Sequence, residues 1–139
     1  MKDILDLIRS DKRFSLLAEI LAASGIGEKL RKSRKVFTFF APTNDALSVL
    51  PKSVLRLLRC AEGKDLAAAI LGRHLVLGSY LYSYDLRART HVTPAYGGKV
   101  RISIKNNALR FGSAPIHTPG FAARNGVVFP VDGVLASRR

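Results

Sequence analysis

Hydrophobic positions in the first part of the chain recur with the period of a helix. The apolar side chains that lie one helical turn apart, or beside that stripe, are Phe14, Leu16, Leu17, Ile20 and Leu21. This spacing places them on one face of an amphipathic helix. Asp11 is a suitable N-cap, and Ser24-Gly25 supplies a left-handed stop. We therefore predict a helix between these two signals, followed by a short second helix over residues 27–33.

The hydrophobic pattern changes at residues 36–41, which read Val-Phe-Thr-Phe-Phe-Ala. Aromatic and β-branched residues on both alternating faces predict a strand that is covered on both sides. Pro42 lacks an N–H group and is expected to end strand pairing where the chain turns. Thr43 or Asn44 can then cap a short helix that runs through Leu50.

Two more helices follow in the pattern. Pro51 suits the first turn of one of them, and Asp65 opens the other, which runs toward His74. The residues expected to face the core are Val54, Leu55 and Leu58 in the first helix and Leu66, Ala69, Ile70 and Leu71 in the second.

The second half of the chain alternates as β-strands do. Residues 99–105 carry cations on one face, and the residues expected on the inward face are Val100, Ile102 and Ile104. Asn106-Asn107 can adopt the positive φ values of a tight turn, and residues 108–111 return as the partner strand.

Residues 127–129 and 131–135 predict a terminal strand with Pro130 at an edge or a bulge. Helices thus come first and a mostly antiparallel sheet follows, which is α+β architecture. The chain has 139 residues, the usual length of one domain, and we interpret residues 1–139 as a single domain.

The charge balance is strongly basic. Lys and Arg number 23 against 10 acids, which gives a net charge of +13. Residues 1–35 hold 9 basic and 5 acidic side chains, and residues 36–139 hold 14 and 5. The excess is therefore spread along the chain and does not form a detachable arm. Such a balance favours acidic partners.

The densest group of cations comprises Lys29, Arg31, Lys32, Arg34 and Lys35. One interpretation is a solvated helix end at which the helix dipole favours positive charge. The other is part of a surface that binds polyanions. Because its cations lie so close together in sequence, we expect this cluster to contribute more to polyanion binding than the strand cations of residues 99–105.

Tyr80, Tyr82 and Tyr84 alternate with other residues, so a strand here would place three tyrosines on one face. They fit either a half-exposed sheet face packed under a loop or a contact surface, to which Arg87 and Arg89 would add cations. Basic residues near aromatic residues also suit nucleic acid, but no recognisable nucleic-acid-binding motif occurs. Specific binding of nucleic acid is therefore not expected.

The residues that most often carry chemistry are scattered. His74, His91 and His117 have no metal-ligand spacing, and Cys60 alone cannot form an intramolecular disulfide. Gly97-Gly98 precedes a strand and not a helix, so it cannot cradle a phosphate, and no Gly-x-Ser-x-Gly elbow occurs. We expect no metal, no cofactor and no catalysis.

Targeting signals are missing from this sequence. Asp6, Arg9 and Asp11 interrupt the apolar core that a secretory leader would need. We expect either that the protein stays inside the cell or that its leader is not part of this sequence. Uninterrupted apolar runs such as residues 66–71 are far shorter than the roughly 20 residues that a membrane span requires.

Three segments together resemble the signatures of the fasciclin domain family. Residues 38–47 resemble its strand that runs into Phe-Ala-Pro-Thr-Asn, residues 71–78 resemble its central Tyr-His region, and residues 125–135 resemble its closing signature. Their order and spacing also agree with the family. The residues that match are Phe40, Ala41, Pro42, Thr43, Asn44, His74, Asn125, Gly126 and Asp132.

We expect these signature residues to serve the fold. Asn125-Gly126 is a turn pair that can start the last strand. Asp132 lies among apolar residues and is expected to be buried, accepting hydrogen bonds from backbone or hydroxyl groups. His74, at a helix end, is expected to be a partly buried hydrogen-bonding residue.

The resemblance implies a fasciclin-like fold, with an N-terminal helical layer packed on a mostly antiparallel β-sheet or wedge. It implies a non-enzymatic interaction module of the cell-adhesion and extracellular-matrix type, with a cell-surface or matrix protein or an acidic polysaccharide as partner. The implied location is extracellular, periplasmic or at the cell surface. An alternative, also drawn from the family, is a carrier of an apolar small molecule such as a carotenoid.

The sequence also departs from the family pattern. Phe129 stands where the closing signature has His, and Arg73 stands where the Tyr-His pair has its aromatic residue. Residues 119–124, where animal members carry an acidic adhesion motif, contain no acid. Integrin binding by the animal mechanism is therefore not expected.

Overall fold

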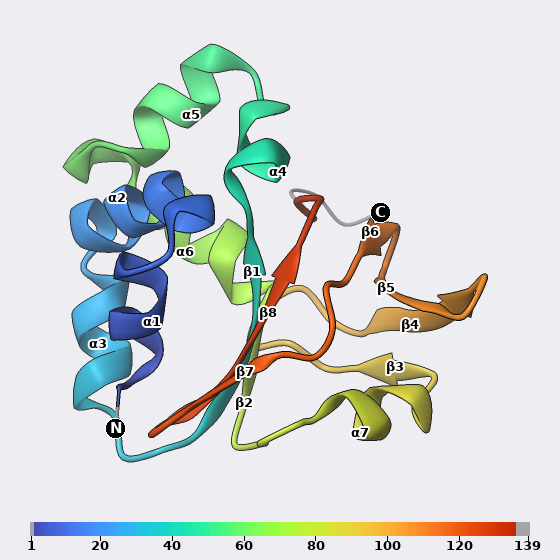
Figure 1. Ribbon diagram of the computed structural model, residues 1–139. Coiled ribbons are helices and arrows are strands. Elements are labelled where there is room, and N and C mark those ends of the chain that lie inside the picture. The colour runs from blue at the N-terminus through green and yellow to red at the C-terminus, as the bar shows by residue number, and fades with distance from the viewer. Residues whose placement is uncertain (1, 136–139) are drawn as a thin grey trace.

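The computed structural model describes residues 2–135 (Figure 1). Of the predicted domain 1–139, residues 1 and 136–139 lie outside this described part. The α-helices are α1 (Ile4–Arg9), α2 (Ser15–Ser24), α3 (Ile26–Lys32), α4 (Asn44–Ser48), α5 (Lys52–Leu58), α6 (Lys64–Gly72) and α7 (Ser83–Arg87). The strands are β1 (Phe37–Pro42), β2 (Leu75–Leu77), β3 (His91–Val92), β4 (Val100–Lys105), β5 (Ala108–Phe111), β6 (Ala114–Pro115), β7 (Phe121–Ala123) and β8 (Gly126–Val131).

The strands form two four-stranded sheets, with the orders β2-β1-β8-β7 and β3-β4-β5-β6. The helices α1, α2, α3 and α6 cover one side of the first sheet, and the second sheet lies on its other side (Figure 1). All pairs are antiparallel except β1 and β8, which run parallel from Phe37↔Gly126 to Pro42↔Val131. The α+β prediction is confirmed, with a parallel pair at the centre of the first sheet.

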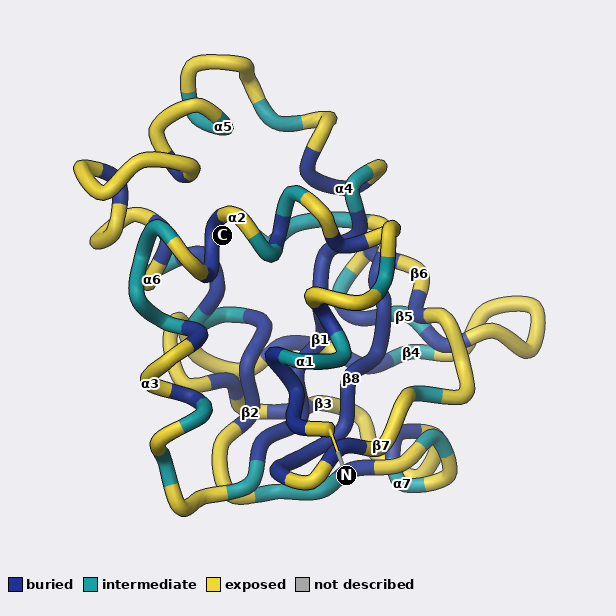
Figure 2. Tube along the Cα trace, turned by 60° about the vertical axis from the view of Figure 1, so that its left-hand side comes forward, coloured by how far each residue is buried: buried dark blue, intermediate teal, exposed yellow. Residues whose placement is uncertain are grey.

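The two faces of β1 belong to two different hydrophobic cores. Phe37, Phe39 and Ala41 face the core under the helices, whereas Phe40 faces the core between the sheets. Strand β8 divides in the same way, and both strands are buried along their whole length (Figure 2). The prediction of a strand covered on both sides is therefore confirmed.

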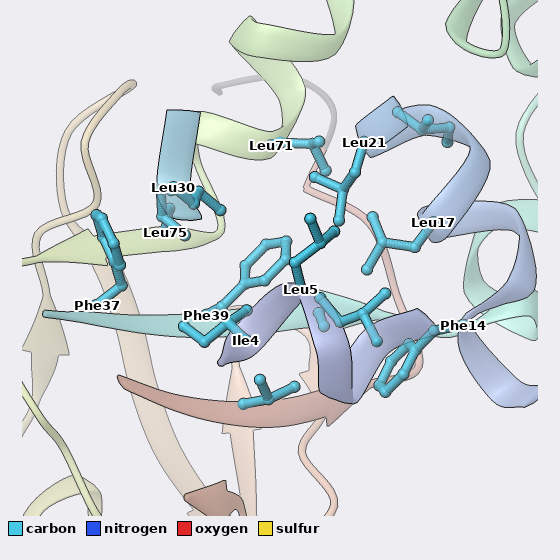
Figure 3. Close-up of a cluster of buried hydrophobic side chains, with 14 of the residues drawn as sticks. Ile4, Leu5, Phe14, Leu17, Leu21, Leu30, Phe37, Phe39, Leu71 and Leu75 are labelled. Atoms are coloured by element: carbon cyan, nitrogen blue, oxygen red, sulfur yellow. The ribbon is translucent and has the colours of Figure 1, made fainter. Parts of the chain in front are cut away.

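Leucine side chains fill the space between the helical layer and β1. Leu5, Leu17, Leu21 and Leu71 converge on Phe39 in this core (Figure 3). Each of the five is at most 3% exposed. This packing fixes the helical layer on the first sheet.

The helical predictions were right in the main, with differences at the ends. Asp11 caps a 3₁₀ turn over Lys12–Phe14, and α2 begins only after it. Gly25, at φ 78°, ends α2 as predicted. Helix α1 was not predicted, although Asp3 and Asp6 form a capping box at its start.

Several predictions of side-chain direction were wrong. Leu66 is 36% exposed, and Ala67 takes the buried position on α6 instead. Ile104 is 49% exposed because it lies near the free end of β4, beyond the two-residue strand β3. Pro130 lies in the inner strand β8 and not at an edge.

Pro42 and Pro130 both lie in the paired central strands. Pro42 is the last residue of β1, still in register with Val131, and one further bond follows it, from the Thr43 N–H to the Val131 carbonyl at 3.1 Å. The Pro130 carbonyl accepts from the His117 N–H at 2.9 Å. A strand tolerates proline where no ladder bond needs its missing N–H.

Candidate interaction surface

The predicted cluster on α3 contains one residue that serves the fold. The Arg31 guanidinium lies 3.0 Å from the Asp3 carboxylate, 2.9 Å from that of Asp6 and 3.5 Å from that of Glu28. It thereby joins α1 to α3. The structure therefore separates Arg31 from the other members of the cluster.

The Asp3 carboxylate is the buried anchor of this arrangement. Its side chain is 3% exposed and also lies 3.3 Å from the Arg124 guanidinium. Burial acts to raise the pKa of Asp3, but the Asp6 N–H and the two guanidinium groups act against it. The pKa of Asp3 therefore lies below its ordinary value.

The remaining members of the predicted cluster are exposed. None of the four forms an ion pair with an acid within residues 2–135. They are Lys29, Lys32, Arg34 and Lys35, which we call the helical cluster. Three acids lie near the helical cluster. Asp3, Asp6 and Glu28 all contact Arg31, which stands between Lys29 and Lys32 in the sequence of α3.

A second basic surface lies on the outer face of the sheet β3-β4-β5-β6. Residues 86–131 contain no acid, and their Lys and Arg residues are Arg87, Arg89, Lys99, Arg101, Lys105, Arg110 and Arg124. The His91↔Arg101 and Ser103↔Arg110 pairs lie directly across neighbouring strands. Paired positions share a face of a sheet, so His91, Arg101 and Arg110 lie on one side of this sheet.

We call this surface the basic sheet face. Its ionisable members are His91, Lys99, Arg101, Lys105 and Arg110. A depression of about 570 Å³ in it is lined by His91, Lys99 and Arg101, together with Thr90 and residues 102–104. The Thr90 hydroxyl lies 3.1 Å from His91 Nδ1 and orients the ring. The lining of the depression contains hydroxyl and cationic groups and no carboxylate.

The three tyrosines lie together, but not on a strand. Tyr80 is in the loop after β2, Tyr82 precedes α7, and Tyr84 is in its first turn. The ring centroids are 5.5 Å apart for Tyr80 and Tyr82 and 5.8 Å apart for Tyr82 and Tyr84. The predicted strand is therefore wrong. The three rings still lie next to one another, because α7 turns the chain at this point; their role as a contact surface stays a prediction.

The two cations beside the tyrosines have different roles. The Arg87 guanidinium donates to the Asn107 carbonyl at 3.2 Å and so holds α7 to the β4–β5 turn. Asn106 and Asn107 in that turn have φ values of 51° and 66°, as predicted. Arg89 is exposed. Within the predicted tyrosine surface, Arg87 is therefore partly structural.

Asp132 is at the surface, which corrects the prediction that it is buried. Its side chain is 37% exposed. It accepts from the Thr43 hydroxyl at 3.0 Å, as expected of a hydroxyl partner, and it lies 2.7 Å from His117 Nε2. No local pattern predicts the His117 contact, since 15 residues separate the two side chains.

The two signature asparagines hold N-terminal elements onto the ends of the central strands. Asn44 does not cap the helix that follows it, which is capped by Thr43. Its Oδ1 accepts instead from the Leu16 N–H at 2.9 Å, at the start of α2. Asn125 Oδ1 accepts from the Ile4 N–H at 2.9 Å, at the start of α1. Each of these two hydrogen bonds joins the start of a helix to a residue near an end of a central strand of the first sheet.

Gly126 and His74 occupy positions where the packing restricts which residue type fits. A Cβ at Gly126 would lie 2.0 Å from the Phe37 carbonyl oxygen, so the close pairing of β8 with β1 requires glycine here. His74 is fully buried; its Nδ1 lies 2.8 Å from the Ile70 carbonyl, and its Nε2 accepts from the Leu135 N–H at 3.1 Å. Burial lowers the pKa of His74 to about 4.

Neither a metal centre nor a membrane span is visible in the described part of the chain. Residues 2–135 contain no group of three His, Cys, Asp or Glu side chains placed to hold a metal ion. Among the same residues, no helix has the length and apolar character needed to cross a bilayer.

Comparisons with known proteins agree with the architecture. The Fasciclin domain family model matches residues 12–137. The transforming growth factor-beta-induced protein ig-h3 of Sus scrofa is 30% identical over 135 residues, which cover 97% of this chain and 19% of the relative. The protein sll1735 of Synechocystis sp. is 29% identical over 135 residues, which cover 97% of this chain and 98% of the relative.

A solved structure shows the same fold. The FAS1 domain pair of fasciclin I, an insect cell adhesion molecule, matches with a TM-score of 0.81 at 18% identity, covering 96% of this chain and 50% of that chain. The present chain spans about a fifth (19%) of the length of ig-h3. With the family model matched over residues 12–137 and the fold shared with fasciclin I, the chain belongs to the fasciclin domain family.

Proposed function

We propose that this chain is a non-enzymatic interaction module of the cell-adhesion and extracellular-matrix type. Its proposed location is extracellular or at the cell surface. Its partners are acidic: a cell-surface or matrix protein, or an acidic polysaccharide. Membership of a family that includes the insect cell adhesion molecule fasciclin I supports the module type.

We choose an acidic partner because residues 86–131 hold seven Lys and Arg residues and no acid. Arg124 pairs with Asp3 at 3.3 Å, but the other six form no ion pair among residues 2–135 and keep their attraction for an external anion. Exposed charges are screened beyond about 10 Å at 0.1 M salt. Binding should therefore be fast, weakly selective and lost steeply as the ionic strength rises.

Retention on an immobilised acidic polysaccharide tests this proposal. The protein is applied at 0.15 M salt to heparin and, as a matched control, to uncharged dextran on the same support. We expect retention on heparin with elution by salt, and none on dextran. If the protein flows through both columns at 0.15 M salt, binding to an acidic polysaccharide is excluded.

The packing favours this function over the carrier of an apolar molecule. An apolar ligand between the helical layer and the first sheet would displace side chains such as Leu5, Leu17 and Phe39, which fill that space (Figure 3). The carrier alternative stays a prediction with a simple test. A visible absorption band in protein from its native source would support it, and colourless protein that takes up no added carotenoid would end it.

A further inference from the structure

The two basic surfaces differ in how many acids stand near them. The helical cluster is the denser of the two in sequence, but its helix also carries Glu28 and lies against Asp3 and Asp6. These carboxylates pair with Arg31, so the charge of Arg31 is largely compensated and four of the five cations of the sequence cluster remain to attract a partner. Density in the sequence therefore overstates the attraction of this cluster.

The basic sheet face has no such opposing charge on its own elements. The nearest acids in sequence are Asp85, in the first turn of α7, and Asp132, after β8. Asp85 accepts from the Tyr82 N–H at 2.8 Å, and Asp132 lies 2.7 Å from His117 and accepts from Thr43. Neither forms an ion pair with a cation of the basic sheet face among residues 2–135. Its field is thus uncompensated.

The sheet also fixes the spacing of these charges. Residues on one face of a strand are about 6.8 Å apart, and neighbouring strands are about 4.8 Å apart. Arg101 faces His91 on one side, and Ser103 faces Arg110 on the other. The result is a two-dimensional array of donors on a rigid backbone, which loses less conformational freedom on binding than cations on a short helix and its following turn.

The side chains on this face suit sulfate groups better than bases. Guanidinium groups bind planar or tetrahedral oxyanions with two parallel hydrogen bonds. Arg101 supplies one such group on this face, and Arg110, whose Nη1 donates to the Ser113 carbonyl at 2.7 Å, supplies its remaining N–H groups. The one aromatic residue of β4 and β5 is Phe111, which is fully buried in the core between the sheets and is not on this face. Stacking platforms for unpaired bases are therefore missing from these strands, whereas a polysaccharide with regularly spaced sulfates needs none.

We propose that the basic sheet face is the primary site for a linear sulfated polysaccharide, and that the helical cluster is secondary. This inference rests on the proposed function, because it assigns the residues and the class of partner of that binding. The depression at His91, Lys99 and Arg101 receives one sulfate group of the chain. Lys105 and Arg110 contact groups farther along it.

Two quadruple variants of equal charge test the assignment. One replaces Lys99, Arg101, Lys105 and Arg110 with Gln, and the other replaces Lys29, Lys32, Arg34 and Lys35 with Gln. Each lowers the net charge from +13 to +9, so any difference between them reports position and not total charge. The probe is a heparin octasaccharide, and its Kd is measured by calorimetry between 0.05 and 0.2 M salt. Circular dichroism and thermal unfolding check that each variant is folded.

We expect the sheet variant to bind at least about tenfold more weakly than the wild type at 0.1 M salt, with a shallower salt dependence. The helical variant should lose less than about threefold. If the sheet variant does not fold, Arg101→Glu alone replaces it and should still weaken binding more than Lys32→Glu.

The outcomes separate the two proposals. A wild-type protein that does not bind the octasaccharide overturns the acidic polysaccharide as partner in the proposed function, and with it this inference. If the wild type binds but the helical variant loses as much affinity as the sheet variant, or more, only the assignment to the basic sheet face is overturned. An oligothymidylate of equal charge is the comparison ligand. If the wild type binds it more tightly than the octasaccharide and the sheet variant does not bind it, the face is assigned to nucleic acid and the proposed polysaccharide partner is overturned.

Discussion

At the scale of single residues, His74 links stability to pH. Its Nε2 accepts from the Leu135 N–H, so the ring is neutral in the folded protein, and its pKa falls from the ordinary 6.5 to about 4. Between these pH values the unfolded chain binds a proton at this residue that the folded protein does not bind. This contribution to stability is therefore complete above pH 6.5 and is lost as the pH falls to 4.

We expect the free energy of unfolding to fall by about 3 kcal/mol over this window because of His74. Urea unfolding at pH 7.5, 5.5 and 4 measures it, with His74→Gln as the comparison. The variant should be less stable at pH 7.5 but show a flatter pH dependence between 6.5 and 4. Asp3 and Asp11, whose pKa values are lowered, change the free energy of unfolding at pH values below this window. Identical pH dependence in both proteins would contradict the account.

Thr43 joins two elements through one hydroxyl. The hydroxyl oxygen accepts from the Ala46 N–H at 3.3 Å, which caps α4, and the group donates to Asp132 at 3.0 Å. Because Thr43 is buried, Thr43→Ala should lower the free energy of unfolding by about 1–2 kcal/mol. Thr43→Ser keeps the hydroxyl and should lose less than half of this, as urea denaturation would show. Equal losses would mean that the hydroxyl contributes little.

Asp132 should contribute less to the free energy of unfolding than its partner Thr43. Its side chain is 37% exposed, so water replaces part of what a substitution removes. We expect Asp132→Ala to lower the free energy of unfolding by about 0.5–1 kcal/mol, measured by the same denaturation. A loss larger than that of Thr43→Ala would point to a buried role after all.

Residue roles could be predicted from the sequence only where they depend on near neighbours. The Thr43 cap and the positive φ values of Asn106-Asn107 follow from local chemistry, and both are observed. Asn44 also offers a cap, but it serves α2, 28 residues away. The Arg31–Asp3 pair spans 28 residues as well. Such contacts depend on how helices pack, which the local pattern does not contain.

At the scale of elements, Arg31 holds α1 against α3. Its guanidinium contacts the buried Asp3 carboxylate, and removing it leaves that charge with Arg124 at 3.3 Å. We expect Arg31→Gln to lower the free energy of unfolding and the unfolding midpoint, because the buried Asp3 carboxylate loses its main partner. Lys32→Gln, one residue along, should change the free energy of unfolding by less than about 0.5 kcal/mol. Thermal unfolding of the two variants compares them, and equal midpoints would show that Arg31 is only a surface charge.

The elements that could be predicted carry a long or strict hydrophobic pattern. β1 is apolar on both faces and β4 alternates, and both are strands. Helices α1 and α7 have 6 and 5 residues, too few for a period to show. At α7 the alternation of the tyrosines predicted a strand instead, because residue spacing of two fits a strand face. The Asp85 side chain bonds the Tyr82 N–H and begins a helix there.

At the scale of the whole molecule, the first sheet separates two cores, and the charge is distributed unevenly over the elements outside them. The helical layer carries acids among its cations, whereas residues 86–131 carry none. Composition alone gave the excess of +13. It could not show that an ion-pair network takes up Arg31, nor that β3, β4 and β5 align their cations on one face.

The central claim is that this acid-free sheet face binds an acidic polysaccharide. The most direct measurement is a titration of the protein with a heparin octasaccharide at 0.15 M salt, followed through the backbone amide signals by NMR. We predict that the largest shifts occur in β3, β4 and β5, at His91, Arg101, Ser103 and Arg110. Shifts concentrated at residues 29–35, or no shifts on saturation with the octasaccharide, would contradict the claim.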